Sequence, residues 1–322
     1  MYLITGCAGF IGYHMSNYLM SQKCKVIGVD SLNKYYSKDY KFVRLRKLKK
    51  KKLFKFYKID LSNKKQINTL ISEKKIKYVI HLAAQPGVVY SYKNPQSYYK
   101  NNVEATQNLV GLIKNMNIKS LIFVSSSSVY GDQKKYPINE NFKLIPKNYY
   151  AKTKIICENI IKKNLKNKNI SYKIVRPFTV YGPYGRPDML ILKYLMHTSS
   201  NKTLKIFNFG KHFRDFTYID DVVKIIYLLS KKIRGNKIYN ICASKPLQIN
   251  KLLEIFKKLN KLYPNIKYFK KRKGEMKITY GSNLKVKKDT NYKNFISIEK
   301  GLEKTIRWYK SFKFKNHLNI QK

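Results

Sequence analysis

The sequence feature that most constrains the fold is a glycine-spaced turn close to the N-terminus. Gly6, Gly9 and Gly12 follow the apolar run Tyr2 to Thr5 and lead into an amphipathic stretch that starts at Ile11. Between a strand and a helix, glycines at this spacing allow a tight turn, a close approach of the backbone to a pyrophosphate, and close packing of the helix on the strand. The helix N-terminus then faces the phosphates. The spacing therefore predicts a dinucleotide site at the end of the first strand.

An acidic residue fits the same site. Asp30 ends the next expected strand, where its carboxylate would accept hydrogen bonds from the adenosine ribose and oppose a 2′-phosphate, which favours NAD over NADP. The alternative for Asp30 is a turn or helix-capping residue before Ser31. Further residues expected beside the cofactor come from the turn, from other strand ends and from a following helix: Phe10, Ile11, Asp60, Ala83, Ala84 and Asn102.

Short apolar runs alternate with helix-length amphipathic segments through the first half of the chain. The expected strands are Tyr2 to Thr5, Lys25 to Asp30, Phe54 to Asp60, Tyr78 to Ala83, Ser120 to Ser125 and Tyr172 to Arg176. The expected helices include Ile11 to Gln22, Gln96 to Met116 and Tyr150 to Asn167. This alternation predicts an α/β fold, a Rossmann-type doubly wound parallel sheet that binds its ligands at the carboxyl ends of the strands.

The texture of the sequence changes after about residue 177, where prolines and glycines break the alternation into turns. We expect residues 1–176 to form an NAD-binding Rossmann domain and residues 177–322 a smaller mixed α/β domain that binds the substrate. The stretch 216–241 is expected to return to the first domain.

Tyr150 and Lys154 are candidates for the chemistry. They lie four residues apart and hence on one face of a helix. A tyrosine that acts as a base at neutral pH needs its pKa lowered by about three units, worth roughly 4 kcal/mol, and a neighbouring ammonium and a positive nicotinamide supply this. The spacing alone is a weak signal in a chain with 28 tyrosines, and a packed tyrosine beside a solvated lysine is the alternative. The glycine turn and a serine run at 125–128 favour hydride transfer.

The charge balance is strongly basic, with 68 Lys+Arg against 17 Asp+Glu and a net charge of +51. Such a balance raises the possibility of nucleic-acid binding. The lysines are spread along the whole chain and accompany many asparagines, isoleucines and tyrosines, which is typical of a codon bias toward A and T. We therefore expect no nucleic-acid partner, although the positive field should attract anionic ligands.

Cysteine usage and hydropathy indicate a reduced compartment. The four cysteines have no metal-ligand spacing, so we expect reduced, mostly buried thiols and no metal. No apolar run approaches the roughly 18 residues that span a bilayer, and the glycine turn follows the first residues too closely for a signal peptide. These features predict a cytoplasmic protein without a membrane partner.

Five segments together carry a resemblance to a known family, namely residues 28–36, 81–88, 125–131, 178–189 and 214–221. Over nearly its full length the chain resembles the extended short-chain dehydrogenase/reductases, and specifically nucleotide-sugar epimerases of the UDP-glucuronate 4-epimerase type. Segments 28–36 and 178–189 distinguish this branch from the wider superfamily. The resemblance implies that bound NAD takes a hydride from C4 of a UDP-sugar while Tyr150 accepts the hydroxyl proton. The transient 4-keto sugar then receives both on its other face.

The resemblance also implies roles for individual residues. Ser126 would bridge the sugar hydroxyl and Tyr150, and Lys154 would hold the nicotinamide ribose. The residues implied to bind the substrate are Ser127 and Ser128 at the sugar, Thr179 and Arg186 at the C6 carboxylate, Arg214 and Arg272 at the diphosphate, and Glu275, where the family has an aspartate. A homodimer is expected, with the helices near 96–116 and 150–167 of each subunit forming a four-helix interface.

The serine run separates related reactions. Related 4,6-dehydratases carry an acidic pair after the catalytic Ser/Thr, and related decarboxylases carry a glutamate just before the Val-Tyr-Gly. Residues 126–128 hold no carboxylate, which leaves epimerisation. Val89 stands where the family commonly has an arginine, so a neutral UDP-hexose or UDP-N-acetylhexosamine is the alternative substrate. A non-catalytic NAD-binding regulatory protein is the alternative of another class, and it would be expected to lack Tyr150 and Lys154.

Overall fold

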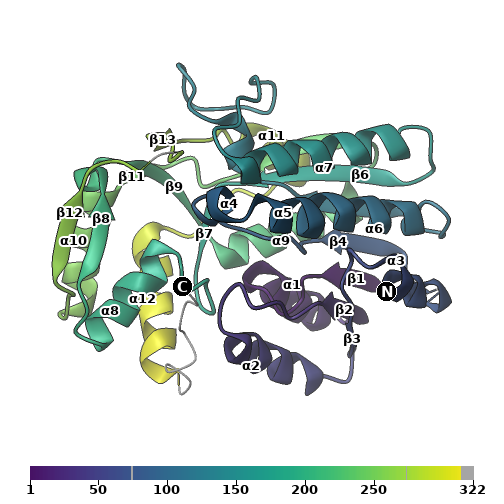
Figure 1. The fold of residues 1–322 in the computed structure, drawn as a ribbon, viewed down its shortest axis with the longest axis horizontal. Coiled ribbons are helices and arrows are strands. Elements are labelled where there is room, and N and C mark those ends of the chain that lie inside the picture. Colours follow the sequence, from purple (N-terminus) through teal and green to yellow (C-terminus); the bar gives the residue numbers. More distant parts are fainter. Residues whose placement is uncertain (74, 273, 313–322) are drawn as a thin grey trace.

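A seven-stranded sheet forms the centre of the structure, a computed structural model that describes residues 1–73, 75–272 and 274–312 (Figure 1). Its strands are β1 (Tyr2–Thr5), β2 (Val26–Asp30), β3 (Phe54–Lys58), β4 (Tyr78–His81), β5 (Ser120–Val124), β6 (Ser171–Pro177) and β10 (Lys237–Ile241). They follow the order β10-β6-β5-β4-β1-β2-β3, and every neighbouring pair is parallel. The strand order reverses between β1 and β4, which places a ligand crevice there. The predicted Rossmann-type sheet is confirmed.

Helices cover both faces of this sheet because the side chains of each strand alternate between two cores. Leu3 belongs to one hydrophobic cluster, whereas its neighbours Tyr2 and Ile4 belong to the other. The helices on the Ile4 side are α1 (Phe10–Ser21), α2 (Lys38–Lys49) and α9 (Ile219–Lys232). The helices on the Leu3 side are α3 (Lys64–Asn68), α6 (Ala105–Ile113) and α7 (Tyr149–Leu165). Short helical segments precede α6: η1 (Thr69–Ser72), α4 (Tyr90–Lys93), α5 (Pro95–Tyr98) and the π-helix η2 (Tyr99–Glu104).

Two smaller sheets and further helices build the second part of the molecule. The first small sheet contains β7 (Thr179–Tyr181), β9 (Phe213–Tyr218), β11 (Pro246–Gln248) and β13 (Ile278–Thr279), and the second contains β8 (Leu204–Phe207) and β12 (Ile266–Phe269). The remaining helical elements of the described residues are η3 (Ser127–Tyr130), α8 (Leu190–Ser199), η4 (Asn208–Gly210), α10 (Ile249–Asn260), α11 (Leu284–Thr290) and α12 (Ile298–Ser311), of which η3 contacts α7 and α11 contacts α9 and β10. The stretch 216–241, which we expected to return to the first domain, contains the end of β9 and all of β10. β10 pairs with β6 of the large sheet, whereas β9 lies in a small sheet. The division into two domains stays a prediction.

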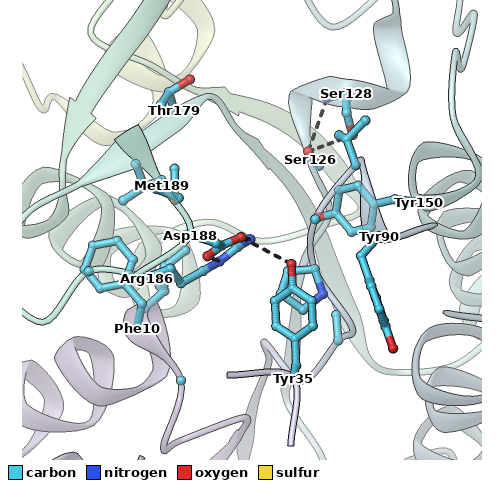
Figure 2. Close-up of a pocket in the computed structure, with 18 of the residues that line it drawn as sticks. Phe10, Tyr35, Tyr90, Ser126, Ser128, Tyr150, Thr179, Arg186, Asp188 and Met189 are labelled. Carbon is cyan, nitrogen blue, oxygen red and sulfur yellow. Dashed lines mark hydrogen bonds and ion pairs between the residues drawn. The ribbon is translucent and has the colours of Figure 1, made fainter. Parts of the chain in front are cut away.

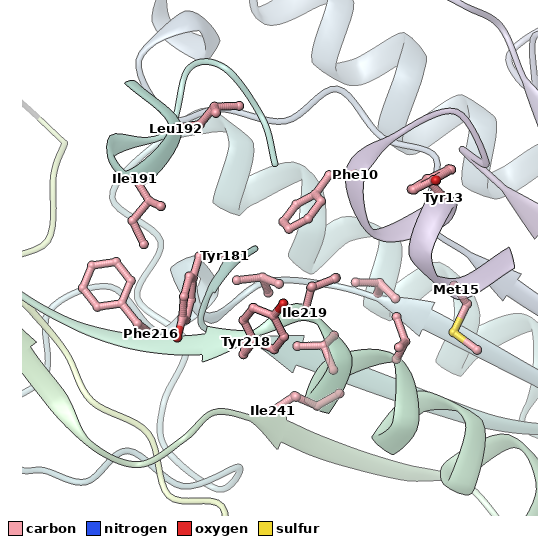
Figure 3. Packing of buried hydrophobic residues seen from close by; sticks show 14 of the residues in the cluster. Phe10, Tyr13, Met15, Tyr181, Ile191, Leu192, Phe216, Tyr218, Ile219 and Ile241 are labelled. Atoms are coloured by element: carbon pink, nitrogen blue, oxygen red, sulfur yellow. The ribbon is translucent and has the colours of Figure 1, made fainter. Parts of the chain in front are cut away.

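The two parts share one hydrophobic core. Phe10 and Met15 of α1 belong to the same buried cluster as Ile219 of α9, Phe216 of β9 and Ile191 of α8 (Figure 3). Continuous packing of this kind holds the small sheets against the carboxyl edge of the large one. Among the described residues, no helix is long and apolar enough to cross a membrane. All four cysteines are free, and three of them are buried, as predicted.

Candidate active site

A cavity of about 980 Å³ lies at the carboxyl ends of β1, β2, β4 and β5 and extends to β8 and β9. The predicted cofactor residues that line it are Gly6, Gly9, Phe10, Ile11, Gly12, Asp30, Asp60, Ala83 and Ala84. The predicted catalytic and substrate residues that line it are Tyr150, Lys154, Ser126, Ser127, Ser128, Thr179, Arg186, Arg214, Arg272 and Glu275. One cavity thus collects residues from almost the whole length of the chain.

The glycine turn leaves room for a diphosphate. A Cβ on Gly6, whose φ is +69°, would lie 2.8 Å from the backbone nitrogen of Ala83, and one on Gly12 would lie 2.1 Å from the carbonyl oxygen of Gly6. Gly9 precedes α1, and neither a side-chain cap nor an acidic residue occupies the first turn of that helix. The first backbone N–H groups of α1 therefore stay available to an anion in the cavity. The residues present fit the pyrophosphate of a dinucleotide.

Asp30 is held firmly at the carboxyl end of β2. Its Oδ2 accepts a hydrogen bond from the Ala8 nitrogen at 3.0 Å, and its Oδ1 accepts one from the Leu32 nitrogen at 2.8 Å. Nearby, Lys41 Nζ donates to the Asn33 side chain at 2.7 Å. Burial lowers the pKa of Lys41 to about 8, against the opposing effect of Asp30. Asp30 can still offer carboxylate lone pairs to ribose hydroxyls.

Helix α7 presents Tyr150 and Lys154 to the cavity. The Asn148 side chain caps the helix by accepting from the Ala151 nitrogen at 2.9 Å, which puts Tyr150 in the first turn and Lys154 one turn later. Lys154 is buried, and its Nζ donates to the Val124 carbonyl at the end of β5 at 2.8 Å. The Tyr150 hydroxyl makes no hydrogen bond with any residue that the structure describes, so it remains available to a substrate (Figure 2).

The serine run forms the wall beside Tyr150. Ser126 Oγ accepts hydrogen bonds from the Ser128 nitrogen at 3.2 Å and from Ser128 Oγ at 2.9 Å. Behind this wall, Ser125 Oγ donates to Glu158 Oε1 at 2.6 Å, and Arg176 donates to both oxygens of that carboxylate at 3.0 and 2.6 Å. Glu158 is fully buried and does not line the cavity. This carboxylate is therefore not placed to act as an acid or base on a ligand in the cavity.

The opposite wall carries an arginine–aspartate pair that the sequence reasoning only half identified (Figure 2). Arg186 Nε donates to Asp188 Oδ1 at 3.0 Å, and the Tyr35 hydroxyl donates to Asp188 Oδ2 at 3.2 Å. Burial disfavours the charge of Arg186, but Asp188 raises the pKa of the guanidinium above its ordinary value. Burial likewise works against the Asp188 carboxylate, and Arg186 outweighs it and lowers that pKa. Arg186 and Asp188 therefore form an ion pair. Thr179 lines the same cavity.

Cations gather at the far end of the cavity. Arg214 Nη1 donates to the Phe213 carbonyl at 2.8 Å, and the guanidinium of Arg272 lies 3.9 Å from the centre of the Phe207 ring. Glu275 forms an ion pair with Arg272, and both residues line the cavity. Guanidinium groups suit phosphate contacts, and this end fits a nucleoside diphosphate.

The cavity also contains residues that sequence reasoning missed, among them Tyr35, Asp188, Lys193 and His212. Tyr35 and Asp188 could have been predicted from the sequence, because they belong to the segments 28–36 and 178–189 that distinguish this branch of the superfamily. Burial, followed by Arg214, lowers the pKa of His212 to about 4, so the ring is neutral at physiological pH. The positions of Lys193 and His212 depend on α8 and β9 coming together, which carries no local sequence signal.

Asn102 departs from its predicted place beside the cofactor. It is buried behind the cavity wall, where its Oδ1 accepts from the Gln85 nitrogen at 2.6 Å and its Nδ2 donates to Thr153 Oγ1 at 2.9 Å. The adjacent Asn101 lines the cavity instead. The reason is that a buried amide must satisfy its own hydrogen-bonding groups, and Asn102 does so by tying the loop after β4 to α7.

Comparison with known proteins shows which family the chain belongs to. Residues 2–242 match the NAD dependent epimerase/dehydratase family. The UDP-glucuronate 4-epimerase of Thermodesulfobacterium geofontis is 39% identical, with 96% of each chain covered. The structure of a UDP-glucuronic acid 4-epimerase from Bacillus cereus, in complex with UDP-glucuronic acid and NAD, is similar with a TM-score of 0.90 at 32% identity, covering 96% of this chain and 98% of that one.

A UDP-N-acetylglucosamine 4-epimerase from Methanobrevibacter ruminantium M1, in complex with UDP-N-acetylmuramic acid, has a TM-score of 0.87 at 28% identity and also covers 96% of this chain and 98% of its own. The similarity thus spans nearly the whole chain and includes the cavity on both sides. The chain belongs to the NAD-dependent epimerase/dehydratase family and is an enzyme that uses NAD.

Proposed function

We propose that this enzyme is a UDP-sugar 4-epimerase that interconverts UDP-glucuronate and UDP-galacturonate. The observation that carries the proposal is the placement of an available Tyr150 hydroxyl beside a serine run that presents no carboxylate to the cavity. Elimination of water from the sugar would need a second acid and base there. A single proton acceptor that returns its proton is sufficient for epimerisation.

The chain's own residues handle the proton. NAD, when bound, supplies a reversible acceptor for the C4 hydride. Tyr150 takes the proton of the C4 hydroxyl, with Ser126 bridging the two oxygens and the Lys154 ammonium favouring the phenolate. The resulting 4-keto sugar would expose its other face within the cavity, where the hydride would return to C4 as Tyr150 gives its proton back to the oxygen. No net oxidation or reduction results, so the cofactor is not consumed.

Residues on both walls support the acidic sugar. Ser127 and Ser128 line one wall and Thr179 and Arg186 the other, so hydroxyl groups and a guanidinium can converge on a C6 carboxylate. Arg186 is already held by Asp188, which fixes the direction of its fork. The UDP-glucuronate 4-epimerases among the relatives agree with this assignment.

A neutral UDP-hexose or UDP-N-acetylhexosamine is the second candidate. Val89 lines the cavity with 42% of its surface exposed, so this position offers no charge to an acidic sugar. The similarity to the epimerase from M. ruminantium points the same way. A purely regulatory NAD-binding role is not favoured, because the complete Tyr150–Lys154 pair faces the cavity.

Separate incubations decide between the substrates. We expect purified enzyme to convert UDP-glucuronate to UDP-galacturonate, with UDP-glucose and UDP-N-acetylglucosamine turned over far more slowly, as measured by chromatography of the nucleotide sugars. Tyr150→Phe should lose activity by at least about 100-fold, because general acid–base catalysis contributes on that order. Tyr149→Phe, the neighbouring change on the same helix, is the matched control and should keep activity. Turnover of UDP-glucose alone would refute the acidic substrate.

We also propose that the enzyme is a cytoplasmic homodimer. Tyr99 of η2 and Ile156 of α7 expose large apolar side chains, 45% and 39% accessible, on helices that pack against each other. Pairing these helices with those of a second copy would bury both. Light scattering should give a dimer mass for the native enzyme and a monomer mass for Ile156→Lys. A native monomer would contradict the proposal.

A further inference from the structure

The two segments that mark the branch, residues 28–36 and 178–189, contact each other in the structure beside helix α2. The loop 182–188 carries Arg186 and Asp188 to the substrate wall, and Tyr35 already contacts Asp188 there. Arg44 of α2 contacts both segments, through the Tyr36 hydroxyl on one side and the Tyr184 and Gly185 carbonyls on the other. It does not line the cavity, and neither the proton chemistry nor the cofactor site accounts for it.

The guanidinium of Arg44 is fully buried between the dinucleotide turn and the loop. Its Nη1 donates to the Ala8 carbonyl in the glycine turn at 3.1 Å and to the Tyr36 hydroxyl at 2.7 Å. Its Nη2 donates to the Tyr184 carbonyl at 2.6 Å and to the Gly185 carbonyl at 3.2 Å. One side chain therefore joins the backbone of the cofactor turn to the backbone of the loop that carries Arg186.

Two further side chains hold the same loop. The Tyr40 hydroxyl donates to the Gly185 carbonyl at 3.1 Å, and its ring lies 4.0 Å from the guanidinium of Arg44. His14 of α1 lies with its Nε2 2.7 Å from the Pro183 carbonyl, which can only accept, so this nitrogen carries the proton. The carbonyls of residues 183, 184 and 185 are thus all received by side chains of α1 and α2.

Packing alone does not explain why an arginine occupies the buried position 44. Within the ranges that the structure describes, no carboxylate forms an ion pair with Arg44, and burial of a charge without an ionic partner is unfavourable. The planar fork reaches acceptors on two sides at once, whereas a lysine ammonium is a point charge on a flexible stem. The arrangement therefore favours a role in fixing two backbone segments relative to each other.

We propose that Arg44 is a positioning residue that fixes the loop 182–188 against the dinucleotide turn and thereby sets the affinity of the Arg186 wall for the acidic sugar. The part that concerns affinity rests on the proposed function, and the part that concerns the loop rests on the contacts alone. Loss of the clamp leaves Tyr150, Lys154 and Ser126 in place, so binding should suffer more than turnover.

The test compares Arg44→Lys and Tyr40→Phe with Tyr2→Phe. Tyr2 is the matched control because its buried hydroxyl lies 3.0 Å from Ser230 Oγ, at the end of β1 away from the cavity. Hydrogen exchange of peptides that span 182–188 is measured by mass spectrometry, together with KM and kcat for UDP-glucuronate. Both clamp variants should exchange faster in 182–188 and raise KM about tenfold while kcat falls less than about threefold. The control should change neither.

Wild-type exchange and KM in both clamp variants would overturn the proposal, and so would a rise in KM that Tyr2→Phe shares. Where Arg44→Lys does not fold, Tyr40→Phe carries the test, because it removes only one hydroxyl. If the native enzyme converts only a neutral UDP-sugar, the assignment of the acidic substrate fails. The exchange experiment still decides in that case whether Arg44 fixes the loop, because it needs no substrate.

Discussion

At the scale of single residues, burial decides which titratable groups are charged. His81 ends β4 with its Nδ1 2.7 Å from Thr5 Oγ1 and its Nε2 3.0 Å from Thr106 Oγ1. Burial, followed by the charge of Lys154, lowers the pKa of His81 to about 3. A neutral imidazole thus joins β1, β4 and α6 near Lys154, where a charge on the ring would oppose the ammonium.

The stability of the enzyme should therefore fall in mild acid. The folded pKa of His81 lies below its ordinary value of 6.5, so the unfolded state binds more protons between pH 6.5 and about 3. This contribution to stability is complete above pH 6.5 and decreases by up to about 1.4 kcal/mol per pH unit as the pH falls. Urea unfolding of His81→Gln at pH 5 and 6.5 should show a shallower dependence than the native chain. An equal dependence would show that His81 is charged in the folded state.

At the scale of elements, a buried ion pair holds α7, β5 and β6 together. Glu158 of α7 accepts from Ser125 at the end of β5 and from Arg176 of β6, which also donates to the Tyr130 hydroxyl at 3.0 Å. The serine run and the Tyr150 helix therefore share one support. This explains how a helix and a strand end hold Tyr150 and the serine run at a defined separation.

Breaking this pair should destabilise the fold strongly. Glu158→Gln leaves the charge of Arg176 buried without a partner, so the free energy of unfolding should decrease by about 3 kcal/mol. The control is Glu254→Gln, whose ion pair with Lys251 is exposed, with 59% and 63% of the side chains accessible. This control should lower the free energy of unfolding far less than Glu158→Gln, because an exposed ion pair contributes little to stability. Equal losses in urea unfolding would contradict a structural role for the buried pair.

The close contacts around Gly12 predict that a single added methyl group weakens cofactor binding at the start of α1. In Gly12→Ala the added methyl would meet the Gly6 carbonyl oxygen at 2.1 Å, so the turn must open and NAD retention should fall by at least about tenfold. Gly111→Ala on α6 is the control, because a Cβ there has no neighbour within 4 Å. Helix propensity predicts a gain of up to about 1 kcal/mol for that variant. NAD released from each purified protein is quantified by chromatography.

At the scale of the whole molecule, the net charge of +51 should act on the rate of substrate capture. UDP-glucuronate carries one negative charge more than UDP-glucose. Its kcat/KM should therefore fall more steeply as salt rises to about 0.5 M, where the Debye length is a few ångströms. A measurement of kcat/KM for both sugars over this range checks the prediction. Equal slopes would show that the field does not distinguish the sugars.

The same charge makes the absence of a nucleic-acid partner testable. We expect no shift of duplex DNA or RNA in a gel at physiological salt, because the lysines are spread along the chain rather than gathered in one arm. UDP-glucuronate turnover should also be unaffected by added DNA. A shift at about 0.15 M salt would establish a second ligand class for this enzyme.

Much of the fold and site could be predicted because the relevant signals are local. The expected run Tyr2 to Thr5 coincides with β1, and the expected helix Tyr150 to Asn167 differs from α7 by one residue at its start and two at its end. Such patterns depend on side-chain alternation, capping and turn chemistry between residues close in the chain. Asn102 shows the limit, because the direction of its amide depends on Gln85 and Thr153, which other elements bring to it.

The sequence by itself determined the parallel α/β architecture, the dinucleotide turn and the Tyr150–Lys154 pair, since periodicity and spacing act over one or two turns of backbone. Only the tertiary structure decided that the segments 28–36 and 178–189 touch, that Asp188 holds Arg186, and that Arg44 joins the loop to the cofactor turn. The physical reason is that buried polar groups must find partners wherever folding brings them, and those partners lie far away in the sequence.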